Sequence, residues 1–277
     1  MGVPDDPGRV RSTGPTGRLR SNAVTDDAPP SPSGPLLAAV ALAVAAGFVD
    51  AHVFVHVIQV FVANMSGNLV LLGIFVGDAH WPEVAAHLVA VALFSASVAV
   101  GTTVHDRRRA AGLPVRPDLL LVVEGTLLLG VLVLGIIDGP ARPGTVDAMD
   151  FPVLAMGAFA MGLQTLVISR VGAVAVTTTY ETGAVARVGQ ETALAARAPE
   201  SERRAHHLAI VKVLGTVVLG YVGGAAAASA ASSSPAWLLV PVVIVLGLAF
   251  VLRPTSWTGS TGSTGSTQPP VDGCAEP

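Results

Sequence analysis

Residues 60–77 have the sequence VFVANMSGNLVLLGIFVG, an apolar stretch that is interrupted near its start by Asn64, Ser66, Gly67 and Asn68. A helix needs about 20 mostly apolar residues to cross a bilayer, and the part after the interruption supplies only about 12. A helix of about 12 residues is about 18 Å long, which spans roughly half of the hydrocarbon layer. The stretch therefore predicts either a half-helix that enters the membrane without crossing it or a short full span.

A second stretch, residues 174–189, is apolar but more strongly interrupted, and it leaves the same two alternatives open. Its polar residues are Thr177, Thr178, Thr179, Tyr180, Glu181 and Arg187.

The chain around these two stretches is dominated by long apolar segments. Six of them have the length of a membrane-spanning helix, roughly residues 36–58, 83–104, 118–138, 151–170, 208–230 and 236–252. Hydrophobic residues make up 51% of the 277 residues and charged residues only 13%, whereas soluble domains carry about 25% charge. The composition excludes an ordinary cytosolic enzyme and a disordered protein, and it predicts an all-α, multi-pass integral membrane protein with eight helical segments.

The distribution of arginine distinguishes the two topologies, because Lys and Arg gather in cytoplasmic loops near the ends of spans. With two half-helices and a cytoplasmic N-terminus, Arg142 lies outside and these residues lie inside: Arg107, Arg108, Arg109, Arg116, Arg170, Arg197, Arg203, Arg204 and Arg253. If both segments cross, the cluster at 107–109 moves outside. The rule favours six transmembrane helices plus two re-entrant half-helices, with both termini in the cytoplasm; eight spans is the alternative.

The chain has three parts by composition. Residues 1–35 are predicted to be a disordered leader, residues 36–252 the membrane domain, and residues 253–277 a disordered tail rich in Gly, Ser and Thr. The single cysteine, Cys274, lies in the tail and excludes a disulfide scaffold or a cysteine-based metal site. The net charge of −3 gives no basic footprint for nucleic acid.

The two halves of the membrane domain, 36–138 and 151–252, share a spacing of glycines. Gly67 follows Gly47 by 20 residues and precedes Gly73 by six, while Gly183 follows Gly162 by 21 and precedes Gly189 by six. Three crossings in each half would turn the second half upside down relative to the first, which predicts a 3+3 inverted repeat. With 30 glycines in the chain, chance spacing is the alternative explanation.

Interrupted segments at matching positions of two repeats mark the substrate site in many secondary transporters. We therefore expect a midplane site for a solute, formed by Asp50, Asn64, Ser66, Gly67, Asn68, Gln164, Thr178, Thr182 and Gly183. Ser66 or Asn68 is suited to cap the N-terminus of the first short helix, and the positive end of a helix dipole attracts a polar or anionic solute. A structural turn, in which these polar groups bond one another, is the alternative.

Other polar residues in the apolar segments predict no metal centre and no catalytic group. His52, His56 and Gln59 have helical spacing on one face, roughly opposite Asp50, but no convincing third ligand accompanies the two histidines. They are expected to form a polar lining or to lie at the interface. Glu124 is expected to be paired or to reach the membrane surface, with a proton relay as the alternative.

The motifs around the two interruptions resemble those of a known family. The runs Gly47-Phe48-Val49-Asp50-Ala51 and Phe61–Asn68, followed by Leu72-Gly73, are similar to the first signature of the YoaK family. The second signature is echoed by Met161-Gly162-Leu163-Gln164, by Thr178 and by Thr182-Gly183. The chain departs from the family pattern at three positions, where Ser66 replaces Thr, Glu181 replaces an apolar residue and Thr165 replaces Asn.

The resemblance covers roughly residues 36–252. It implies a bacterial multi-pass protein of the inner membrane, defined by a domain of unknown function, and it implies no activity.

Taken together, these features favour a permease for a small polar or anionic solute. A passive channel and a non-transporting scaffold or partner subunit are the alternatives. The sequence contains no Walker A motif and no GxGxxG after a strand, so neither an enzymatic activity nor a cofactor is predicted. The expected partners are the lipid bilayer and the solute, and Gly73 and Gly77 have a spacing that permits a homo-oligomer.

Overall fold

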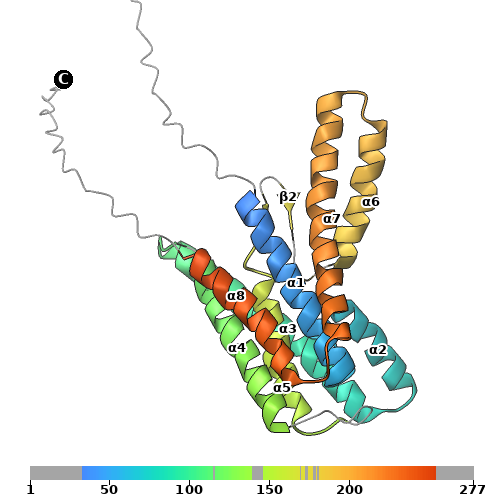
Figure 1. Cartoon of the computed structure of the whole chain (residues 1–277), viewed down its shortest axis with the longest axis vertical. Coiled ribbons are helices and arrows are strands. Elements are labelled where there is room, and N and C mark those ends of the chain that lie inside the picture. The colour runs from blue at the N-terminus through green and yellow to red at the C-terminus, as the bar shows by residue number, and fades with distance from the viewer. Residues whose placement is uncertain are drawn as a thin grey trace, which may run out of the picture. The chain divides into compact units, whose positions relative to one another are not determined.

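The computed structural model describes residues 33–114, 116–138, 146–168, 170–171, 174–176, 179 and 181–253 (Figure 1). Within these ranges it contains eight α-helices: α1 (Ser33–His56), α2 (Met65–Gly77), α3 (Trp81–Ala110), α4 (Pro117–Asp138), α5 (Asp150–Gln164), α6 (Glu181–Arg197), α7 (Ser201–Ala230) and α8 (Leu239–Val251). A 3₁₀ turn, Pro235–Leu238, precedes α8, and two short strands, β1 (Arg170–Val171) and β2 (Val174–Ala175), pair antiparallel. The prediction of a helical chain with eight helical segments is confirmed. Most of the two predicted tails, residues 1–32 and 254–277, lies outside the described residues, as does Arg142.

Among the helices of the described residues, four are long and apolar enough to cross a membrane: α1, α3, α4 and α7. Helices α5 and α8 have only 15 and 13 residues, so each is shorter than the segment from which it was predicted. The first of these segments was predicted to be helical to residue 170, but α5 ends at Gln164 and Arg170 belongs to β1.

The predicted half-helix at 174–189 is displaced along the chain. Val174 and Ala175 form β2, and α6 begins only at Glu181 and continues to Arg197. The cause is local composition, because Val171, Val174 and the threonines that follow are β-branched and favour extended backbone over helix.

Helices α1 and α7 are in close contact because the residues where they meet include glycines, which have no side chain to keep the backbones apart. Gly224 of α7 lies against the backbone of Val44 and Phe48, and Gly47 of α1 lies against the backbone of Tyr221. A methyl group added at either glycine would overlap a backbone carbonyl. Farther along, His56 at the end of α1 contacts the carbonyl oxygen of Ala228 near the end of α7. The contacts therefore advance in the same direction along both helices, which run parallel.

Helices α3 and α5 form a second pair of the same kind. Gly162 of α5 lies against Phe94 and Ser97, and Gly101 of α3 lies against Leu163 and Leu166. Residue numbers rise together along the two helices, so this pair is also parallel. Small residues at such contacts allow the backbones to approach and gain van der Waals energy, which is the main source of helix association in lipid.

Helices α4 and α8 run antiparallel, since Gly125 lies against Leu246 and Gly135 against Pro235. Together with α1 and α5 they enclose the largest hydrophobic core, which includes Leu42, Leu121 and Leu154.

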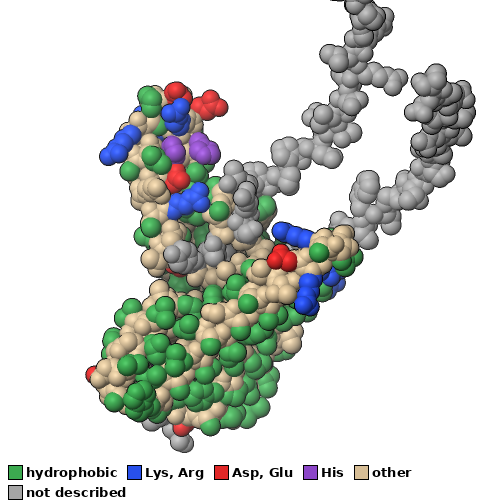
Figure 2. All heavy atoms as spheres, turned by 180° about the vertical axis from the view of Figure 1, so that it is seen from behind, with side chains coloured by type: hydrophobic (Ala, Val, Ile, Leu, Met, Phe, Trp, Pro, Cys, Tyr) green, Lys and Arg blue, Asp and Glu red, His purple; other side chains and the backbone are tan. Residues whose placement is uncertain are grey.

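Basic residues gather at the same end of the helices. Three arginines, 107–109, occupy the last turn of α3, Arg116 precedes α4 and pairs with Asp118 at 2.7 Å, and Arg253 follows α8. Two acidic residues lie at the helix ends that are far from these arginines. Asp78 follows the last residue of α2, and Asp138 is the last residue of α4. Figure 2 shows basic side chains in the upper part of the view and a broad hydrophobic surface below them.

Each short helix runs beside one long helix. Helix α2 packs against α3, where the ring of Phe75 lies 5.3 Å from that of His87. Helix α6 packs against α7 as a hairpin (Figure 1), tied by Glu191 and His207, whose Oε2 and Nδ1 atoms are 2.6 Å apart. The first turns of α2 and α6 are the starting point for the candidate site.

Candidate functional site

Asp50 holds the loop that leads into α2. Its carboxyl group accepts hydrogen bonds from the backbone N–H groups of Val62 (2.7 Å), Ala63 (2.6 Å) and Asn64 (2.9 Å), and from the hydroxyl group of Tyr221 on α7. The side chain is only 1% exposed. These four donors match the acceptor capacity of a carboxylate. Asp50 therefore joins α1, the loop and α7, and it fixes where α2 begins.

Two asparagines complete the loop. Asn68 is fully buried, where its amide accepts from the N–H of Phe61 at 2.9 Å and donates to the carbonyl of the same residue at 2.6 Å. The N-cap of α2 is Asn64, which accepts from the N–H of Gly67 at 3.1 Å and from Ser66 Oγ at 2.8 Å. The cap is therefore neither Ser66 nor Asn68, because both of these residues lie inside the helix.

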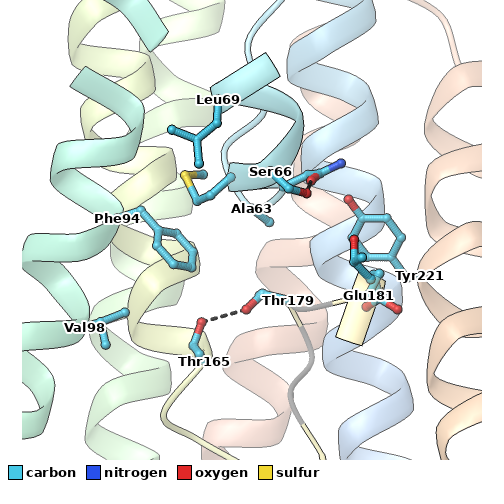
Figure 3. A pocket seen from close by; sticks show the side chains of 12 residues that line it. Ala63, Ser66, Leu69, Phe94, Val98, Thr165, Thr179, Glu181 and Tyr221 are labelled. Atoms are coloured by element: carbon cyan, nitrogen blue, oxygen red, sulfur yellow. Dashed lines mark hydrogen bonds between the residues drawn. The ribbon is translucent and has the colours of Figure 1, made fainter. Parts of the chain in front are cut away.

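A cavity of about 510 Å³ lies between the first turns of the two short helices (Figure 3). It is lined by Ala63, Asn64, Met65, Ser66, Leu69, Phe94, Val98, Thr165, Thr179, Glu181, Thr182 and Tyr221. The cavity thus brings together α2, α3, α6, α7 and the two segments that precede the short helices. Its volume falls in the range of pockets that hold small molecules.

The polar lining consists mainly of hydroxyl groups and helix ends. Ser66 comes from the first turn of α2 and Thr182 from the first turn of α6. The hydroxyl oxygens of Thr165 and Thr179 are 2.7 Å apart and share a hydrogen bond (Figure 3). In the part of the chain that the structure describes, none of the lining residues is Lys or Arg. Two helix N-termini therefore supply the positive partial charge at this cavity.

Glu181 brings a carboxyl group to the cavity without a hydrogen-bond partner. Neither of its carboxyl oxygens accepts a hydrogen bond from the described residues, and both oxygens are shielded from solvent. In Figure 3 the side chain lies beside that of Tyr221.

The structure brings only part of the predicted site to the cavity. Asn64, Ser66 and Thr182 line it, whereas Asp50 and Asn68 lie behind the lining and hold the loop. The other predicted residues that do not line it are Gly67, Gln164 and Gly183. Gly67 packs on the ring of Phe61, and Gln164 donates to the carbonyl of Leu42 at 2.9 Å. Thr178 lies outside the described residues.

Several lining residues were not among those predicted, notably Thr165, Glu181 and Tyr221. Thr165 and Glu181 do carry a signal in the sequence, because they are two of the three departures from the pattern of the family that the chain resembles. Tyr221 carries no such signal, since it lies 171 residues from Asp50, to which it donates its hydroxyl hydrogen.

Other polar groups of the described helices border a smaller cavity. The rings of His52 and His56 are 5.1 Å apart and border a small cavity of about 20 Å³, together with Asp138. Gln59 follows the end of α1, so it does not share a helical face with the histidines as predicted. Within the described residues, no three His, Cys, Asp or Glu side chains are grouped as metal ligands.

Glu124 of α4 is fully buried. Its oxygens accept no hydrogen bond from the described residues, so it neither pairs with one of them nor reaches the surface.

One of three comparisons with known proteins supports the family resemblance that the motifs indicate. The comparisons with curated proteins and with solved structures give no match. The model of one family, described as "Protein of unknown function (DUF1275)", matches residues 38–252. This range includes all eight helices of the described residues apart from the first five positions of α1 and contains both interrupted segments. The chain therefore belongs to the DUF1275 family, which is the YoaK family that the motifs around Gly67 and Gly183 indicate.

Proposed function

We propose that the protein is a permease of the bacterial inner membrane that binds a small polar or anionic solute in the cavity between α2 and α6. The observation that carries the proposal is that one cavity is lined by the first turns of two short helices from different halves of the chain. Half-helix N-termini that meet beside a polar cavity are the arrangement by which many secondary transporters hold a solute.

The packing of the helices supports the proposed inverted repeat. In this scheme α1, α2, α3 and α4 are equivalent to α5, α6, α7 and α8. The pair α1–α7 then corresponds to α5–α3, and each pair is parallel and meets at glycines. In the same way α2 beside α3 corresponds to α6 beside α7. Gly47 and Gly162, which occupy equivalent positions in the sequence, each lie at such a contact.

We propose six crossings, with α2 and α6 entering from opposite faces and the arginine-rich end in the cytoplasm. The prediction is tested by single cysteines at Arg109 and at Asp78, placed in a Cys274→Ser chain. A membrane-impermeant maleimide is expected to label Arg109→Cys only from the cytoplasmic side and Asp78→Cys only from the outer side. Eight crossings would reverse both results, because Arg109 would then lie outside and Asp78 inside.

Solute flux is the direct test of the permease. Purified protein in vesicles is expected to accelerate the swelling caused by an inward gradient of one or more of glycerol, urea, lactate and methanesulfonate. Val98→Trp puts a large side chain into the cavity and is expected to reduce this flux to the level of protein-free vesicles. Val100→Trp is the matched control, because Val100 is 51% exposed on the same helix and does not line the cavity.

The same measurement separates the alternatives. Flux that saturates with solute concentration supports a permease, whereas flux that rises linearly supports a passive channel. A protein that accelerates none of these solutes would contradict the proposal and favour a scaffold. Equal flux through Val98→Trp and Val100→Trp would place the pathway elsewhere in the protein.

A further inference from the structure

Among the described residues that line the cavity, Glu181 is the one with a carboxyl group, and none presents a charged side chain to it as a partner. The residues that line the cavity from α2, α3 and the segment after α5 are uncharged. From α7 it faces Tyr221, whose hydroxyl group donates to Asp50 of α1. The next charged residue along α6, Arg187, pairs instead with Glu191 at 3.6 Å.

These surroundings favour the protonated form of Glu181. A buried carboxylate without hydrogen-bond donors loses its hydration and gains nothing in return. The position of Glu181 in the first turn of α6 acts in the opposite sense, because the positive end of a helix favours a negative charge. The loss of hydration without a compensating donor is the larger effect, so Glu181 can take up a proton in the cavity.

Occupation of the cavity by an anion would change this balance. The two helix ends and the hydroxyl groups attract an anion, but an ionised Glu181 would repel it across a cavity whose described lining includes no Lys or Arg. A protonated Glu181 carries no charge and has an O–H group that can donate to the anion. Binding of the anion and binding of the proton must therefore strengthen each other by the same factor.

We propose that the solute is an anion and that it binds together with one proton, which the carboxyl group of Glu181 carries. The inference rests on the proposed permease. The proton comes from water on one side of the membrane when the Glu181 carboxylate accepts it. It returns to water on the other side after the anion has left, so one proton crosses with each anion and Glu181 is restored.

The experiment uses the full chain in vesicles that contain a trapped pH-sensitive dye, with the membrane potential clamped. Methanesulfonate is the first probe because it stays ionised and does not leak as a neutral acid; lactate is the second. An inward gradient of either anion is expected to acidify the lumen of wild-type vesicles. Its rate should fall as the pH is raised, because the protonated fraction of Glu181 falls.

Glu181→Gln separates coupling from binding, because the amide keeps the shape of a protonated carboxyl group and cannot release a proton. This variant is expected to exchange anion for anion at a rate independent of pH and to cause no acidification. Glu202→Gln, at an exposed position in the first turn of α7, is the control and should behave as wild type.

Each of the other outcomes contradicts either the coupling inference alone or the permease proposal as well. Wild-type anion flux without acidification, or acidification by Glu181→Gln at the wild-type rate, overturns the inference and leaves the permease standing. Flux of a cation such as methylammonium in place of the anions also overturns it. If the wild-type protein moves none of the probes, the permease proposal fails and the inference fails with it.

Discussion

Replacement of Asp50 by alanine is expected to prevent the protein from folding stably. The substitution leaves three backbone N–H groups and the Tyr221 hydroxyl without their acceptor in a site that is almost fully buried. Each of these four buried donors costs about 1–3 kcal/mol when it has no partner, so the total loss should be at least about 4 kcal/mol. The measurement is thermal unfolding of the detergent-purified protein, followed by circular dichroism, together with the yield of monodisperse protein.

Two further variants make this prediction specific. Asp50→Asn retains one oxygen acceptor and should be less destabilising than alanine, while Asp106→Ala, at an exposed position of α3, should unfold as wild type does. Tyr221→Phe removes one of the four donors to Asp50 and should have only a small effect. If Asp50→Ala unfolds at the wild-type temperature, the carboxylate does not hold the loop.

Gly224→Ala is also expected to destabilise the protein. The new methyl group would overlap the carbonyl of Val44 and force α1 and α7 apart over the contact that also contains Gly47. Overpacking of this kind costs about 1–3 kcal/mol, and the rigid backbone on the other side cannot move aside as a flexible side chain can. The same unfolding measurement applies.

The neighbouring glycine provides a matched control, because a methyl group at Gly223 meets no atom within 4 Å. Gly223→Ala should be neutral or should stabilise the protein by up to about 1 kcal/mol, since alanine is the better helix former. Equal effects at the two positions would mean that the loss at Gly224 comes from helix propensity and not from packing.

The position of the first short helix could be predicted from local sequence. The interruption at Asn64–Asn68 and the end near Gly77 enclose too few apolar residues for a span, and α2 covers this range. The second short helix was predicted less well, because a β-branched run precedes Glu181 and delays the start of α6.

The gathering of arginines at the end of α3, before α4 and after α8 also follows from the sequence. A cluster of arginines is costly in the apolar part of a helix and therefore lies at a helix end, and the order of spans then determines which loops share an end.

The composition of the cavity could not be predicted in the same way. In α1 and α7 the apolar residues are spread around the helix without forming one apolar face, so the sequences do not indicate which face is buried. The contact faces depend instead on where glycines of one helix meet the backbone of another, as at Gly224 and Val44. Only that packing places Tyr221 beside Asp50 and Thr165 beside Thr179.

The sequence alone therefore determined that this is a helical membrane protein with two interrupted segments and an arginine-rich end, because hydrophobic length and charge act locally along the chain. The tertiary structure alone decided that Asp50 and Asn68 support the loop while Glu181 lines the cavity. The reason is that the partners of a buried polar group come from distant helices, and their approach is set by close packing that no single segment encodes.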